Sequence, residues 1–149
     1  VQTCALPICS RGSLARRLVL CVDNDPTVLV AMRTLLQGWS CEVITARDVL
    51  SACHEIDQRG AVPDIVLMDY HLEGDVTGLE ALGTLAAHLG RHVPAIIITA
   101  NYTEAVRQAA DTLGYRILNK PVRPGALRAL MAQMLSRETP EPVRSATVV

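Results

Sequence analysis

Five short apolar segments recur along the chain, at residues 18–22, 41–46, 65–68, 95–98 and 115–118, and those beginning at Leu18, Ile65 and Ala95 are apolar at every position. A strand of that kind is covered on both faces, which is typical of a parallel sheet flanked by helices. Right-handed crossovers between parallel strands then place helices on both sides of the sheet. The segments therefore predict a doubly wound five-stranded α/β domain.

Helical spacing follows each apolar segment. Val28, Met32, Leu35, Leu36 and Trp39 share one face of a first helix. Similar faces predict helices over residues 49–56, 79–89, 106–113 and 127–135. Five strand–helix units thus follow one another, which makes one domain of ordinary size.

The two ends of the chain differ from its middle. Residues 1–15 show no periodicity, and the opening VQTCALPI resembles the translation of a sequencing adapter. We expect this segment to be disordered, as a linker or as residues foreign to the natural chain. Residues 138–149 carry Pro140 and Pro142 among polar residues and predict a disordered tail. The folded domain is expected over residues 16–137.

Charge and cysteine content exclude several classes of protein. The formal net charge is −1, which gives no reason to expect a nucleic-acid partner or direct membrane contact. The apolar segments are too short to span a bilayer, and no signal peptide is recognisable. The five cysteines include no CxxC pair, and the four histidines have no metal-ligand spacing. We therefore expect a cytoplasmic protein with reduced structural thiols.

Polar residues end the central strands. The first strand leads into Asp23, the third ends in Asp69, the fourth ends in Thr99, and the fifth leads into Lys120. Ligands of open parallel sheets bind at the carboxyl ends of the strands. Carboxylates can hold Mg²⁺, one of them can act as a nucleophile, and an ammonium group can pair with a phosphoryl oxygen. Together these residues predict phosphoryl transfer to Asp69.

Four segments carry a resemblance to a known family. The segments VLCVDNDP, PDIVLMDYHL, AIIITAN and LNKPV, in this order, resemble the receiver domain of two-component response regulators over about residues 16–137. The resemblance implies a flavodoxin-like receiver fold with strand order 2-1-3-4-5 and five helices. It also implies a domain that catalyses its own phosphorylation and is not otherwise an enzyme.

The resemblance assigns roles to individual residues. Asp69 would be the phosphoacceptor, with Thr99 and Lys120 contacting the phosphoryl group and a cis peptide bond joining Lys120 to Pro121. The implied protein ligands of Mg²⁺ are Asp23, Asn24, Asp69 and the backbone carbonyl of His71. The phosphoryl group would come from a phosphohistidine on a histidine kinase or a histidine phosphotransfer protein.

Two positions depart from the pattern of the family. Asn24 replaces an acidic residue, and its neutral amide predicts weaker Mg²⁺ binding, for which Asp25 is a candidate compensating charge. Ile117 stands where many receivers have an aromatic residue that moves with Thr99. We therefore expect the domain to relay a phosphoryl group more than to switch conformation.

Other functions stay open beside the leading one. Asn24 motivates a degenerate receiver that serves as a phosphorylation-independent docking module. A flavodoxin-like cofactor site is disfavoured, because the acidic residues around Asp23 would repel a phosphate. For the parent protein we favour the C-terminal receiver of a hybrid sensor histidine kinase over a stand-alone receiver. The pattern does not predict a complete transcription factor, since no helix-turn-helix follows the last helix.

Overall fold

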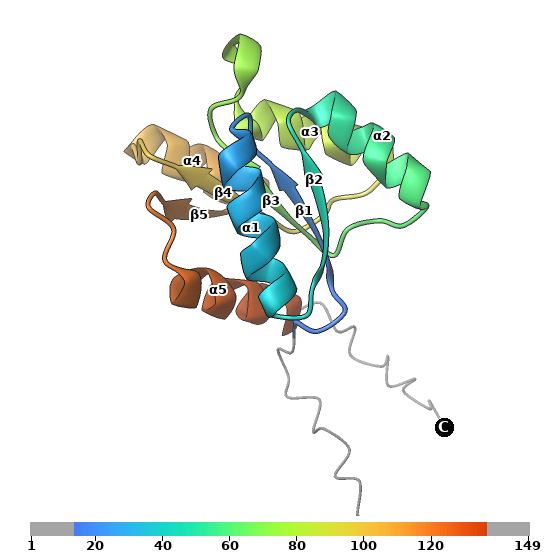
Figure 1. Ribbon diagram of the computed structural model, residues 1–149. Helices are drawn as coiled ribbons and strands as arrows, with labels where there is room; N and C mark the ends of the chain where they lie inside the picture. Colours follow the sequence, from blue (N-terminus) through green and yellow to red (C-terminus); the bar gives the residue numbers. More distant parts are fainter. Residues whose placement is uncertain (1–13, 137–149) are drawn as a thin grey trace, which may run out of the picture.

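The computed structural model describes residues 14–136, which form one five-stranded sheet and its helices (Figure 1). The strands are β1 (Leu18–Val22), β2 (Glu42–Ala46), β3 (Ile65–Asp69), β4 (Ala95–Thr99) and β5 (Arg116–Asn119). The helices are α1 (Pro26–Gly38), α2 (Val49–Arg59), α3 (Gly78–Leu89), α4 (Glu104–Leu113) and α5 (Pro124–Ser136), with a short 3-10 helix, η1 (Glu73–Asp75). Every pairing in the sheet is parallel, and the strand order is β2-β1-β3-β4-β5. The predicted doubly wound fold and its strand order are confirmed.

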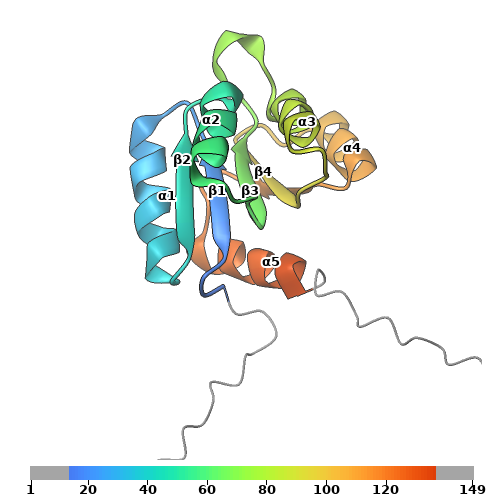
Figure 2. The same cartoon turned by 90° about the vertical axis from the view of Figure 1, so that its right-hand side faces the viewer.

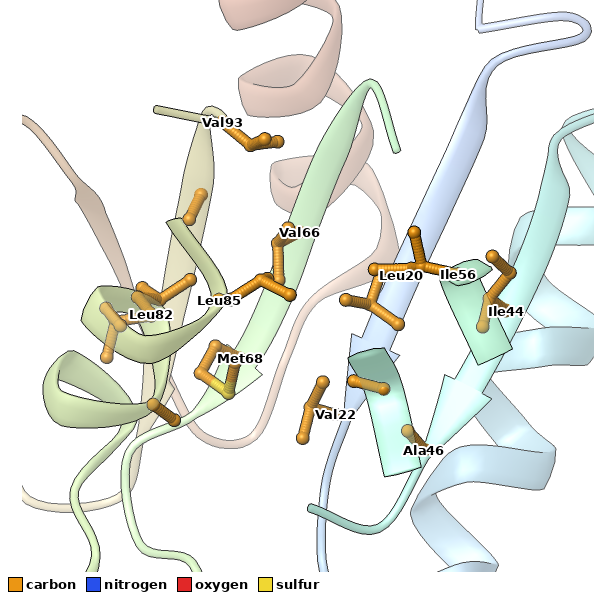
Figure 3. Packing of buried hydrophobic residues seen from close by; sticks show 14 of the residues in the cluster. Leu20, Val22, Ile44, Ala46, Ile56, Val66, Met68, Leu82, Leu85 and Val93 are labelled. Atoms are coloured by element: carbon orange, nitrogen blue, oxygen red, sulfur yellow. The ribbon is translucent and has the colours of Figure 1, made fainter. Parts of the chain in front are cut away.

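Helices cover both faces of the sheet. Helices α1 and α5 lie on one face, and α2, α3 and α4 lie on the other (Figures 1 and 2). Because successive strand residues point to opposite faces, β3 sends Val66 and Met68 toward α2 and α3, and sends Ile65 and Leu67 toward α1 and α5. Figure 3 shows Met68 beside Leu85 of α3 in the first of these two cores. Burial on both faces explains why the central strands are apolar at every position.

Local signals set the ends of the helices. The side chains of Asp25, Asp48, Thr77 and Thr103 accept backbone hydrogen bonds at the first turns of α1, α2, α3 and α4. Helix α2 ends at Gly60, whose φ of 70° lies in the left-handed region that glycine adopts without strain. These signals agree with the hydrophobic pattern, and the elements begin and end within three residues of their predicted positions. Among residues 14–136, no helix is both long and apolar enough to cross a membrane.

The end of the segment expected to be disordered has a defined place in the structure. Leu14, which falls in the segment expected to be disordered, is buried in the core beneath α1 and α5. Its carbonyl accepts hydrogen bonds from the backbone N–H of Arg17 at 3.1 Å and from the Cys41 thiol at 3.4 Å. A lone apolar residue has no periodicity, so the pattern did not reveal it. The expected disorder of residues 1–13 and 138–149 lies outside the described residues.

The buried thiols behave as the sequence predicted. Cys21, Cys41 and Cys53 are free and buried. Burial raises the pKa of the Cys21 thiol to about 12, so it stays protonated and unreactive at neutral pH. Cys4 and Cys9 lie outside the described residues.

Candidate functional site

The parallel sheet brings the predicted residues to one edge. Asp23 directly follows β1, Asp69 ends β3, Thr99 ends β4, and Lys120 directly follows β5. Asp23, Asp69 and Thr99 are buried, with exposed fractions of 6%, 5% and 0%, although each is polar. Buried polar groups in a packed domain need partners. The partners of these residues therefore indicate what the edge can do.

Lys120 joins the two carboxylates. Its Nζ lies 3.2 Å from Asp69 Oδ1 and 3.8 Å from Asp23 Oδ2. Its backbone N–H donates to the Thr99 carbonyl at 2.9 Å, which fixes the position of the residue at the end of β5. The following peptide bond, to Pro121, is cis, as the resemblance implied. Lys120 is the sole lysine in the chain, so no other ammonium side chain can take its place.

Asp23 is held in place by the start of α1. Its Oδ1 accepts the backbone N–H of Asp25 at 2.8 Å. Burial raises the pKa of the Asp23 carboxyl above its ordinary value, and the neighbouring Asp69 carboxylate adds to this effect. The Asp25 N–H and the Lys120 ammonium lower the same pKa. The edge therefore concentrates negative charge that a single ammonium group balances in part.

Asp25 has a structural role. Its Oδ1 accepts the backbone N–H of Thr27 at 2.9 Å and so caps α1, and its side chain is exposed. One of its carboxylate oxygens is therefore engaged at the helix end. The capped carboxylate keeps its charge, which adds to the effects that raise the pKa of Asp23. Compensation by Asp25 for the neutral Asn24, which is half-buried beside it, therefore stays a prediction.

The Thr99 hydroxyl is engaged within its own turn. It accepts the backbone N–H of Asn101 at 3.1 Å and lies 3.3 Å from the Asn101 carbonyl, to which it donates. To donate to a phosphoryl group on Asp69, the hydroxyl has to give up its hydrogen bond to the Asn101 carbonyl, because it has one proton to donate. Asn101 was not singled out by the sequence, because a turn partner two residues away leaves no distinctive pattern.

The loop after Asp69 folds back as a short hairpin that stands out from the body of the domain (Figures 1 and 2). An antiparallel bridge pairs His71 with Thr77. Its hydrogen bonds run from the Leu72 N–H to the Val76 carbonyl at 3.1 Å and from the Gly78 N–H to the Tyr70 carbonyl at 2.7 Å. The carbonyl of His71 takes no part in these two bonds, which suits its implied role as a metal ligand.

Gly78 connects this loop to the acceptor strand more closely than the sequence suggested. It is the first residue of α3 and is buried. A Cβ atom there would lie 2.5 Å from the Asp69 carbonyl oxygen. The start of α3 thus packs directly against the end of β3, and only glycine fits at the contact. Nothing in the local sequence distinguishes this glycine from an ordinary turn residue.

The donor set at this edge suits a hard cation. Asp23 and Asp69 supply carboxylate oxygens, Asn24 can supply an amide oxygen, and His71 can supply a backbone carbonyl. Mg²⁺ prefers oxygen ligands and commonly keeps several waters, so two carboxylates suffice. Nowhere in residues 14–136 do three His, Cys, Asp or Glu side chains group as a metal site. Oxygen donors of this kind fit Mg²⁺ better than a softer metal.

Comparison with known proteins agrees with this geometry. The family model described as the response regulator receiver domain matches residues 19–132, most of the described chain. The chain belongs to this receiver-domain family. The match begins at the second residue of β1 and ends within α5, so all the residues of the edge fall inside it.

Curated relatives place the receiver in different contexts. The cyclic di-GMP phosphodiesterase response regulator RpfG of Xanthomonas campestris pv. campestris is 39% identical over 136 residues, which are 85% of this chain and 34% of that protein. The chain thus spans about a third of its length. An uncharacterized 14.6 kDa protein of Leptolyngbya boryana is 30% identical, over 81% of this chain and 92% of the relative.

Solved structures support the fold. The chemotaxis protein CheY4 of Vibrio cholerae superimposes with a TM-score of 0.71 at 23% identity, over 80% of this chain and 98% of that one. A CheY-like receiver domain of Methanospirillum hungatei gives the same TM-score at 22% identity, over 83% of this chain and 96% of the other. At this identity the likeness concerns the fold alone.

Proposed function

We propose that this receiver domain accepts a phosphoryl group on Asp69, from a phosphohistidine and with the help of Mg²⁺. The observation that carries the proposal is the position of the Lys120 ammonium, 3.2 Å from the buried Asp69 carboxylate and 3.8 Å from the Asp23 carboxylate. A structural ion pair needs one carboxylate. A second carboxylate, buried at the same ammonium, is expected where a site also holds a metal cation.

The chain's own groups suit the transfer. An oxygen of Asp69 attacks the phosphorus, the N–P bond of the phosphohistidine breaks, and its electron pair leaves with the imidazole. The product is an aspartyl phosphate. Lys120 then pairs with an oxygen of the transferred group instead of the carboxylate. The Thr99 hydroxyl gives up its hydrogen bond to the Asn101 carbonyl and donates to a second phosphoryl oxygen. Protein catalysis of phosphoryl transfer is mainly positioning and charge stabilisation, which this edge provides.

Bound Mg²⁺ would neutralise charge on the phosphoryl oxygens. We propose that Asp23, Asn24, Asp69 and the His71 carbonyl hold it. The excess of carboxylate over ammonium charge supports this assignment, because a divalent cation relieves the repulsion from Asp69, which adds to the effect of burial in raising the pKa of Asp23.

The phosphodonor would be a histidine kinase or a histidine phosphotransfer protein. Relatives named as two-component response regulators support this class of partner. The phosphodiesterase activity in the name of RpfG belongs to that protein, of which this chain matches a third. A hybrid histidine kinase as the parent stays a prediction, and the gene upstream of residue 1 would test it.

A direct test uses acetyl phosphate or a phosphorylated histidine partner with Mg²⁺. The full chain should gain the mass of one phosphoryl group, and base should remove it, as expected of an acyl phosphate. Chelation of the metal should abolish the modification. Asp69→Asn should block it, whereas Asp75→Asn, which changes an exposed carboxylate of the adjacent loop, should not. Phosphorylation that persists in Asp69→Asn would refute the proposal.

Asn24 favours a second candidate, a receiver that docks to a partner without being phosphorylated. A neutral amide among the implied ligands lowers the charge available to the metal. The two candidates differ in a Mg²⁺ titration followed by NMR. Saturable shifts at Asp69 and His71 support the phosphoacceptor, and their absence at millimolar Mg²⁺ supports the docking module.

A further inference from the structure

An apolar cavity opens beside the phosphoacceptor, on the face covered by α1 and α5. Its volume is ≈ 270 Å³. Cys21, Leu67 and Ile98 line it from the sheet, and Val28 and Met32 of α1 and Val122 after β5 line it from the sides. The C-terminal end of α1 lies beside α5. There the Arg128 guanidinium lies 5.6 Å from the centre of the Trp39 ring.

The cavity has a polar side. Asp23, Asp69 and Lys120 line it as well, and these are the groups at the strand ends. Two carboxylates face one ammonium there, so the polar side carries about one negative charge in excess. The remaining lining is aliphatic. A ligand that matches both parts combines a positive head with an apolar body.

The volume limits the size of that body. An engineered apolar cavity of roughly 150 Å³ accommodates benzene. The present cavity is larger than that, yet smaller than most pockets for drug-sized ligands, which begin at about 300 Å³. An alkyl chain of medium length or a single aromatic ring therefore suits it.

We propose that this cavity binds a small amphiphilic amine, with its ammonium group on the Asp23 and Asp69 carboxylates and its apolar body between α1 and the loop after β5. Such a ligand occupies the carboxylates that the proposed Mg²⁺ site uses. The amine and Mg²⁺ therefore exclude each other, and each weakens the other's binding by the same factor. Binding of the amine does not depend on the proposed function. A bound amine should also slow phosphorylation of Asp69, and this second effect rests on the proposed function.

A ligand series tests the proposal without any substitution. n-Hexylamine, n-hexanol, hexanoate and methylamine are titrated into the full chain, and binding is measured by NMR shifts. We expect hexylamine to bind about tenfold more tightly than hexanol, since a hydrogen bond to a charged group is worth at least that factor. Methylamine and hexanoate should bind more weakly still. Equal binding of hexylamine and hexanol would show that the carboxylates are not used.

Matched variants of α1 test the location. Val28 lines the cavity, whereas Val30 is 66% exposed on the same helix and does not line it. Val28→Phe should weaken hexylamine about tenfold, because the ring and the ligand compete for one volume, and Val30→Phe should leave the affinity unchanged. Val122→Phe narrows the cavity from its other side and provides the same test if Val28→Phe does not fold. Hexylamine that binds all three variants as it binds the unchanged chain would overturn the proposal.

Competition with Mg²⁺ separates this inference from the proposed function. Adding Mg²⁺ should raise the apparent dissociation constant of hexylamine, and a constant value would overturn the shared-carboxylate geometry. Phosphorylation of Asp69 without any binding of hexylamine refutes the cavity site alone. Binding of hexylamine by a chain that is never phosphorylated refutes the proposed function alone.

Discussion

The contact between Gly78 and the acceptor strand yields a quantitative prediction. In Gly78→Ala, the new Cβ would lie 2.5 Å from the Asp69 carbonyl oxygen, 3.0 Å from Met68 Cγ and 3.1 Å from Tyr70 Cα. Ordinary non-bonded contact lies at about 3.5–4.0 Å, so the nearest overlap is about 1 Å. Two of the three neighbours are backbone atoms, so α3 has to shift. Overpacking of this kind costs about 1–3 kcal/mol.

Gly83 provides the matched control on the same helix. A Cβ there meets nothing within 4 Å, and the residue is exposed in the interior of α3. Gly83→Ala should therefore stabilise the domain by about 0.5–1 kcal/mol, the usual gain at an unhindered helical position. The two substitutions are chemically identical but should have opposite signs.

Urea unfolding followed by circular dichroism measures both free energies by linear extrapolation, provided the slope m stays constant. Phosphorylation by acetyl phosphate gives a second readout, since a displaced Asp69 should react more slowly in Gly78→Ala and normally in Gly83→Ala. If Gly78→Ala were as stable as Gly83→Ala, the inferred close packing of α3 on β3 would be refuted.

Three further predictions concern the acidic start of α1. Asn24→Asp should tighten Mg²⁺ binding by about tenfold, equivalent to 1.4 kcal/mol, because a carboxylate replaces a neutral amide. A fluorescence titration measures the Mg²⁺ affinity, and an unchanged affinity would exclude residue 24 as a ligand. Asp25→Ala should cost about 1 kcal/mol of unfolding free energy through the lost cap at Thr27. Because Asp25 is exposed to solvent, its loss should change Mg²⁺ affinity by less than about twofold; a larger loss of affinity would identify Asp25 as a compensating charge. The pKa of Asp23 is raised above its ordinary 3.8 in the folded state. Folded Asp23 therefore holds its proton more tightly than the same residue in the unfolded chain. The free energy of unfolding of the metal-free protein should consequently fall as pH rises from near 3.8 through the raised pKa. Asp23→Asn should flatten that fall in urea unfolding measured across pH, and an equally steep fall in Asp23→Asn would contradict the assignment.

Most of the site was predictable because it lies at strand ends. Asp23, Asp69, Thr99 and Lys120 each end or follow an apolar segment, and parallel strands bring their carboxyl ends together whatever the details of packing. The pattern that identified the strands therefore also located these side chains. Binding of Mg²⁺ at this edge stays a prediction, which the titrations described above would test.

Other features depended on contacts between residues distant in sequence. Leu14 is ordered because it packs beneath α1 and α5, which no local pattern signals. Gly78 looks like a turn residue, but its lack of a side chain is required by the Asp69 carbonyl nine positions earlier. Asp25 was a candidate compensating charge by its proximity to Asn24, and the structure shows that it also caps α1 through the Thr27 N–H.

By itself, the sequence determined the fold class, the strand order through its resemblance to receivers, and the identity of the polar edge. The fold class and the polar edge follow from periodicity and from the chain positions at which strands end, both of which are local properties. Only the tertiary structure decided the ammonium geometry of Lys120, the engagement of Thr99 with Asn101, and the apolar cavity between Val28 and Val122. Each of these depends on distances between side chains carried by different elements, and side-chain packing in three dimensions sets those distances.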